Sequence, residues 1–82
     1  MTHPDAPISP SRIARKIADL YAPTPDDARA ELESLDHDYL DRMLDDARDE
    51  LDDDELTTMN NYPDETIDAL DYIIRDRARQ LP

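Results

Sequence analysis

The 82-residue chain has 22 acidic and 9 basic side chains, which give a formal net charge of −13 at neutral pH. It has no cysteine, so disulfide bonds, thiolate metal sites and cysteine nucleophiles are excluded. A chain of this length builds one small domain without room for a deep catalytic cleft, and no segment approaches the ~20 apolar residues of a membrane span. We therefore expect a noncatalytic, cytoplasmic protein.

The residue types favour an all-α fold. Glycine and valine are both absent, which removes the usual material of tight hairpins and much of that of strands. Apolar residues instead recur at helical spacing. We predict a compact bundle of four helices plus a short helical turn in a single domain over residues 9–82, preceded by a flexible arm over residues 1–8.

The first two helices begin with the same signal. Ser9 and Thr24 each precede a proline, and a hydroxyl cap followed by proline at the first helical position is typical of a helix start. The pattern predicts helices over about 10–22 and 25–34.

A third helix is predicted over about 37–52, with Asp36 as its cap and with apolar residues at i, i+3 and i+4 spacing. The rival interpretation is one continuous helix from Pro25 to Leu51, because the apolar stripe nearly continues. We favour the break, since Asp36 is well suited to start a new helix.

The acidic run at 52–55 interrupts this pattern, and residues at about 54–60 are predicted to form only a short helical turn. The last helix is predicted over about 63–80, because Pro63 opens it and three arginines lie near its C-terminal end, where cations favour the helix dipole. Leu81 is expected to pack inward.

The acids are concentrated in one part of the chain. Nineteen of the 22 lie between Asp26 and Asp71, where only three arginines offset them. In the predicted third helix, aspartates recur every three or four residues on the face opposite the leucines and form an anionic stripe of Asp38, Asp41, Asp45, Asp49 and Asp52. One helix presents a carboxylate only every ~5 Å, whereas duplex DNA carries one charge per about 1.7 Å. Mimicry of nucleic acid therefore requires acids from several elements on one surface.

We predict a binding protein whose acidic surface covers the basic, nucleic-acid-binding surface of a partner protein. The expected partner-binding residues are the stripe, the acids after it and two tyrosines: Asp38, Asp41, Asp45, Asp49, Asp52, Asp53, Asp54, Glu55, Tyr39 and Tyr62. In size and charge the chain resembles the acidic inhibitors that phages and mobile elements direct against host defence, such as anti-CRISPR and antirestriction proteins. No cofactor, metal, direct nucleic-acid contact or membrane contact is expected, and the protein is expected to be a monomer or a homodimer. If it is encoded by a phage, it would act in the host cytoplasm.

Other interpretations remain open. A surface that only keeps the protein soluble, as in halophilic proteins, would have the same acid richness and the same excess of arginine over lysine. An adaptor module would instead bind its partner through an apolar groove lined by Leu56, Met59 and Tyr62. A regulatory dimer would use a basic cluster on the first helix, Arg12 to Lys16, to bind DNA. The same cluster can alternatively pair with the acidic segment within the fold or across a dimer.

The sequence predicts no metal site and no catalytic residue, although an acidic run and a histidine are candidates. The acids from Asp45 to Glu55 lack the glycine and the distal glutamate of an EF-hand loop. His37, between two aspartates, has no second histidine or nucleophile placed to assist it, so we interpret it as an exposed residue in the first turn of a helix.

Overall fold

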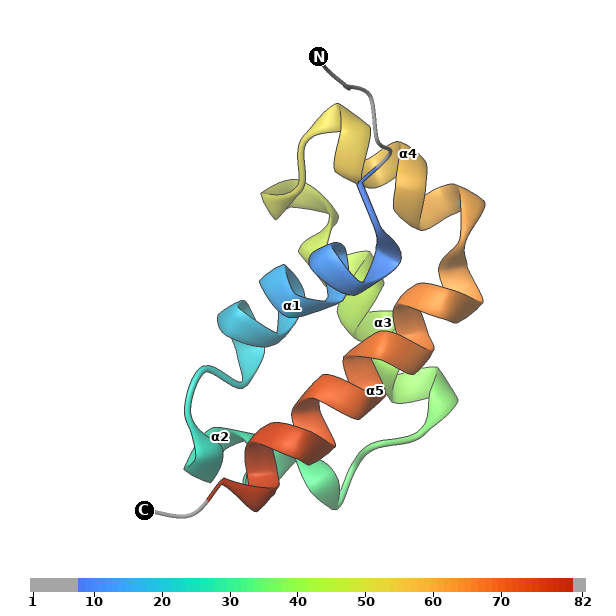
Figure 1. Ribbon diagram of the computed structural model, residues 1–82. Coiled ribbons are helices and arrows are strands. Elements are labelled where there is room, and N and C mark those ends of the chain that lie inside the picture. Colours follow the sequence, from blue (N-terminus) through green and yellow to red (C-terminus); the bar gives the residue numbers. More distant parts are fainter. Residues whose placement is uncertain (1–7, 81–82) are drawn as a thin grey trace.

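The computed structural model describes residues 8–80, and over that range every element is helical (Figure 1). In chain order the elements are α1 (Pro10–Tyr21), α2 (Pro25–Leu32), α3 (His37–Asp46), the 3₁₀ helix η1 (Ala47–Glu50), α4 (Asp53–Asn61) and α5 (Pro63–Arg79). The predicted all-α class is confirmed. The described part contains five α-helices, however, rather than four helices and a turn.

The predicted flexible arm over residues 1–8 lies outside the described residues except for Ile8, which packs against the core. The inward packing predicted for Leu81 also lies outside them.

Side-chain caps start the first three helices as predicted. Ser9, Thr24 and Asp36 each accept a hydrogen bond from the backbone N–H three residues later, at 3.2, 3.1 and 2.8 Å. These bonds satisfy backbone donors that have no partner within the helix. The predicted break between the second and third helices is confirmed, because α2 ends at Leu32 and Asp36 has an extended backbone.

The predicted helix over 37–52 is wrong in its second half. Regular α3 ends at Asp46, the chain tightens into η1, and Leu51 is extended with φ −104° and ψ 146°. Asp52 then caps a new helix: its Oδ1 accepts from the Glu55 N–H at 2.9 Å, and the Glu55 Oε1 accepts from the Asp52 N–H at 3.0 Å. This reciprocal pair is a capping box, which satisfies two backbone donors at once.

The segment predicted as a short turn at about 54–60 therefore lies in α4, a helix of nine residues. Its Met59 and Thr58 are buried. Within residues 8–80, each helix is too short or too polar to cross a bilayer.

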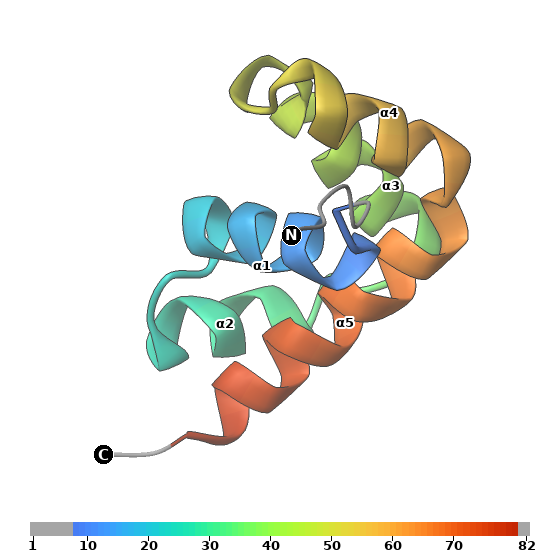
Figure 2. The same cartoon turned by 45° about the horizontal axis from the view of Figure 1, so that its top comes forward.

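Helix α5 organises the packing, because it contacts each of the other four α-helices. Figures 1 and 2 show α2 beside the C-terminal half of α5 and α4 beyond its N-terminal end. Ile13 and Ile17 of α1 and Leu70 and Ile74 of α5 are completely buried. The core thus joins the first and last helices of the described chain, and it leaves one side of α3 and α4 at the surface.

Candidate partner-binding surface

Most acidic side chains between Asp26 and Asp71 lie on the surface. Sixteen of the nineteen are exposed, Glu31 and Asp71 are half-buried, and Glu55 is buried. Dense exposed carboxylates generate a negative potential that attracts cationic surfaces and repels nucleic acid.

Three arginines lie within this acidic segment, and two of them pair with acids in their own turn. Arg29 forms an ion pair with Asp26, and the Arg48 Nε lies 3.2 Å from the Asp45 Oδ1. Arg42 is exposed. Such surface pairs contribute little stability, and they neutralise only a small part of the negative charge.

The anionic stripe is shorter than predicted, because the helix that carries it ends early. Asp38, Asp41 and Asp45 are exposed on α3. Asp49 lies on η1, and Asp52 is the cap of α4, so both belong to the bend that follows α3. All five side chains are exposed, but they follow a bent path instead of one straight helix.

Asp53 and Asp54 are exposed in the first turn of α4. Carboxylates there interact favourably with the positive end of the helix dipole. Together with the Asp52 cap, they stabilise the start of α4 as well as adding charge to the surface.

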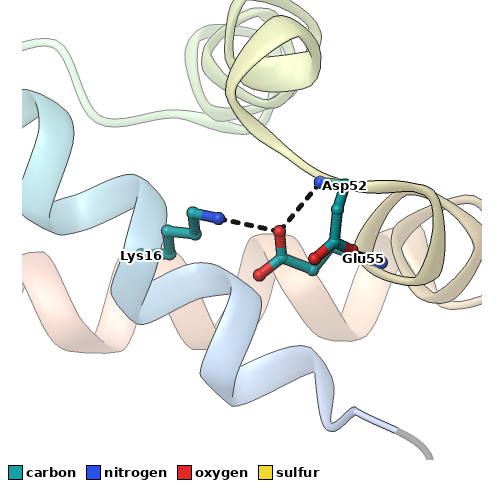
Figure 3. A network of polar contacts seen from close by, with 3 residues as sticks. All are labelled: Lys16, Asp52 and Glu55. Atoms are coloured by element: carbon teal, nitrogen blue, oxygen red, sulfur yellow. Dashed lines mark hydrogen bonds and ion pairs between the residues drawn. The ribbon is translucent and has the colours of Figure 1, made fainter.

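Glu55 differs from its neighbours, since it is only 8% exposed. Figure 3 shows the Lys16 side chain extending from α1 toward it, with the Lys16 Nζ 2.8 Å from the Glu55 Oε1. The hydrogen bond from Lys16, with the one from the Asp52 N–H, lowers the pKa of Glu55, and the same bond raises the pKa of Lys16. The predicted pairing of the first helix's basic cluster with the acidic segment within the fold is confirmed for Lys16. Glu55 therefore joins α1 to α4, and we exclude it from the candidate binding surface.

The two tyrosines expected at the surface have different environments. Tyr39 is half-buried, and its hydroxyl donates a hydrogen bond to the Glu31 carboxylate of α2. This bond, with partial burial, raises the pKa of Tyr39. Tyr62, between α4 and α5, is 49% exposed. Tyr39 thus connects two helices, whereas Tyr62 is accessible to a partner.

A pocket of about 330 Å³ lies where α3, η1, α4 and the start of α5 meet. Its lining combines two carboxylates, one guanidinium, one amide and apolar groups: Asp41, Asp45, Arg48, Asn60, Leu44, Met59 and Pro63. The Arg48 Nη2 lies 3.1 Å from the Asn60 Oδ1. Arg48 and Asn60 are not among the predicted site residues, because their contact depends on α4 folding back toward η1.

Asp64 extends the acidic surface onto α5. The His37 Nε2 at the start of α3 lies 3.9 Å from the Asp64 Oδ1, and both side chains are largely exposed. Acids of α3 and of the first turn of α5 therefore border one region, which also contains the pocket.

The remaining basic residues lie mainly on α1 and the C-terminal half of α5. The Arg77 Nη2 lies 2.8 Å from the Asp19 Oδ1, and its Nη1 donates to the Ala22 carbonyl at 3.1 Å. Arg75 pairs with Asp71 at 3.0 Å. The basic residues of α1 and α5 are thus partly paired with acids, whereas α3, η1 and α4 contain only two arginines, Arg42 and Arg48.

In the described part of the chain, no group of three or more histidine, aspartate and glutamate side chains is arranged to hold a metal ion. No family model, curated protein or solved structure matches this sequence. A functional interpretation therefore depends on the surface itself.

Proposed function

We propose that this protein is a noncatalytic binding protein whose acidic surface covers a basic, nucleic-acid-binding surface of a partner protein and blocks it. The observation that supports this most strongly is the exposure of sixteen acids between Asp26 and Asp71, with only three arginines among them. So large a single-sign excess repels copies of the chain from one another and is more than solubility requires.

The mechanism is competition. Carboxylates neutralise lysines and arginines on the partner, accelerate the encounter through long-range attraction and exclude the phosphates that would bind there. Seventeen of the 22 acids are aspartates, whose short side chains lose less conformational entropy on binding than glutamates do. Tyr62 would add apolar contact area and so slow dissociation. This mode of action is that of a DNA- or RNA-mimic inhibitor, the type used by phages and mobile elements against host defence.

The alternative function, an adaptor that binds through an apolar groove of Leu56, Met59 and Tyr62, has weaker support. Met59 is only 3% exposed and Leu56 is half-buried, so of these three side chains only Tyr62 presents a large area to a partner. Substitution of exposed acids would leave binding through such a groove nearly unchanged.

The first test is capture on the immobilised chain from a nuclease-treated lysate of the native host at ~0.15 M salt, a concentration at which exposed charges still act over about 8 Å. We expect recovery of a basic protein that added DNA or RNA displaces. A captured protein that is indifferent to both salt and nucleic acid would contradict the proposal.

The second test measures the affinity of that partner for two matched variants. One replaces Asp41, Asp49 and Asp53 by Asn on α3, η1 and α4. The other makes the same change in net charge on α2 and its following turn and at the end of α5, through Asp27→Asn, Glu33→Gln and Asp76→Asn.

The first variant should raise the dissociation constant about tenfold, or ~1.4 kcal/mol, and the second much less. Equal losses would mean that net charge alone, without a defined surface, governs binding.

A further inference from the structure

The pocket at the junction of α3, α4 and α5 has mixed chemistry. Its acidic wall comes from Asp41 and Asp45, while Leu44, Met59 and Pro63 supply apolar atoms. A side chain suited to it needs a cationic head group and an aliphatic stem. Arginine and lysine both have these properties.

One wall of the pocket already binds a guanidinium group. Arg48 donates from Nε to the Asp45 Oδ1 at 3.2 Å and from Nη2 to the Asn60 Oδ1 at 3.1 Å. The two acceptors come from different helices, α3 and α4, and two separate N–H groups of one planar guanidinium reach them. These two oxygen acceptors are thus already occupied by the protein's own Arg48.

Arg48 does not satisfy all the acids around the pocket. Asp41 lies one turn before Asp45 on α3, is exposed, and forms no ion pair within residues 8–80. With two carboxylates and one guanidinium in the lining, one negative charge remains uncompensated. The pocket is therefore complementary to one more cation.

We propose that this pocket receives an arginine side chain of the basic partner, with its guanidinium paired to Asp41 and its stem against the exposed Pro63. The inference rests on the proposed function and names the chemistry of one contact within it. Arginine is favoured over lysine because its head group is planar, is weakly hydrated and forms bidentate bonds to carboxylates. The lysine ammonium is strongly hydrated and gains less in a partly apolar pocket.

Two synthetic peptides of equal charge test this preference. Both are acetylated, amidated and five residues long; one is all lysine, and the other has arginine at its centre. Each is titrated into the ¹⁵N-labelled full chain at about 50 mM salt, where charge attraction is strong. We expect the arginine peptide to bind about threefold to fivefold tighter, with its largest amide shift changes at residues 41–48 and 59–64.

Charge-matched variants separate the pocket from the overall charge. Asp41→Asn should weaken binding of the arginine peptide about fivefold and abolish the preference for arginine. Asp76→Asn, an exposed aspartate near the end of α5, should change binding less than about twofold.

Arg48→Gln removes the guanidinium already present in the pocket and should strengthen binding about threefold. Arg12→Gln, at an exposed side chain of α1, makes the same change in charge and should have a smaller effect. Far-UV circular dichroism of each variant checks that the fold is kept.

Equal affinities for the two peptides, or shift changes spread evenly over the acidic segment, would overturn the arginine pocket and leave the proposed function standing. An arginine preference at the pocket in a chain that never competes with nucleic acid for a basic protein would support the pocket and overturn the proposed function.

Discussion

Glu55 differs from the exposed acids beside it, because it is buried and forms an ion pair with Lys16. The carboxylate lies under α1, accepts hydrogen bonds from Lys16 and from the Asp52 backbone, and is almost removed from water. A buried carboxylate remains ionised only when such donors offset its loss of hydration. Glu55 thus stabilises the fold, whereas the neighbouring acids are exposed to solvent.

Replacing Glu55 by Gln should make the free energy of unfolding depend less on pH between pH 7 and pH 3. The folded-state pKa of Glu55 is lowered, so its ionisation contributes stability above its unfolded-state pKa, near 4.5, and this contribution disappears as the pH falls through the folded-state pKa. Glutamine keeps the capping box but not the charge. Urea unfolding from pH 7 to pH 3 should show the wild type more stable by about 1 kcal/mol at pH 7, with the difference vanishing toward pH 3.

Glu65→Gln is the matched control, because Glu65 is exposed in the first turn of α5. Its effect should be only a few tenths of a kcal/mol, roughly the size of a helix-dipole interaction. A Glu55→Gln difference that stays constant from pH 7 to pH 3 would contradict the role assigned to this carboxylate.

Tyr39→Phe should destabilise the protein by about 1 kcal/mol, since it leaves the Glu31 carboxylate without its hydroxyl donor. In the wild type, absorbance at alkaline pH should show two phenols that titrate above the usual range, because the Glu31 hydrogen bond raises the pKa of Tyr39 and burial raises the pKa of Tyr21. Only one of these two components should remain in Tyr39→Phe. Tyr72→Phe, at a side chain that is 69% exposed, should leave unfolding unchanged, and equal effects of the two substitutions would argue against the Tyr39 bond.

At the scale of elements, α4 is stabilised by both its cap and its buried contacts. It has nine residues and begins directly after the extended Leu51. Short helices are marginal unless capping or packing stabilises them. Asp52 supplies the cap, and Met59 and Thr58 supply buried contacts.

Asp52→Ala should therefore lower the free energy of unfolding by about 0.5–2 kcal/mol, whereas Asp52→Asn should cost little, because asparagine is also a good cap. Thermal or urea unfolding compares the two variants. If Asn and Ala cost the same, the charge of Asp52 and not its capping bond would be the source of stability.

Local signals predict most helix starts in this fold, and contacts distant in sequence explain the errors. Ser9, Thr24 and Asp36 cap helices because each needs only its own next three residues. The Asp52 to Glu55 capping box is equally local, but the prediction that this run of acids interrupts the helical pattern is wrong, because the run starts α4. For the same reason the predicted third helix is too long.

The sequence predicts those parts of the candidate surface that depend on local periodicity, and it misses the parts that depend on contacts distant in sequence. The exposure of Asp38, Asp41 and Asp45 follows from helical periodicity, because the leucines of α3 face the core. The burial of Glu55 depends on Lys16, which is 39 residues away in sequence. The pocket depends on how α3, α4 and α5 meet, and no short segment encodes that arrangement.

At the scale of the whole molecule, the −13 charge opposes folding, because it brings like charges closer together. Added salt should therefore stabilise the protein. Raising NaCl from about 0.05 to 1 M shortens the screening length to about 3 Å, which weakens the repulsion between exposed acids more than it weakens the short Lys16–Glu55 contact. The urea midpoint should rise over this range, and a midpoint that falls would mean that attractive ion pairs outweigh the repulsion.

The packing of the first helix against the last also has a consequence for biosynthesis. Ile13 and Ile17 of α1 are covered largely by the packing of α5, and α5 ends 58 residues after α1 does. At about 5–20 residues per second, the ribosome needs about 3–12 s to make that intervening chain. During this interval the apolar stripe of α1 has no α5 to cover it, while the acidic segment emerges directly behind it. Neighbouring nascent chains on one messenger RNA would then repel each other, so the charge would protect the unfinished protein from aggregation until α5 arrives.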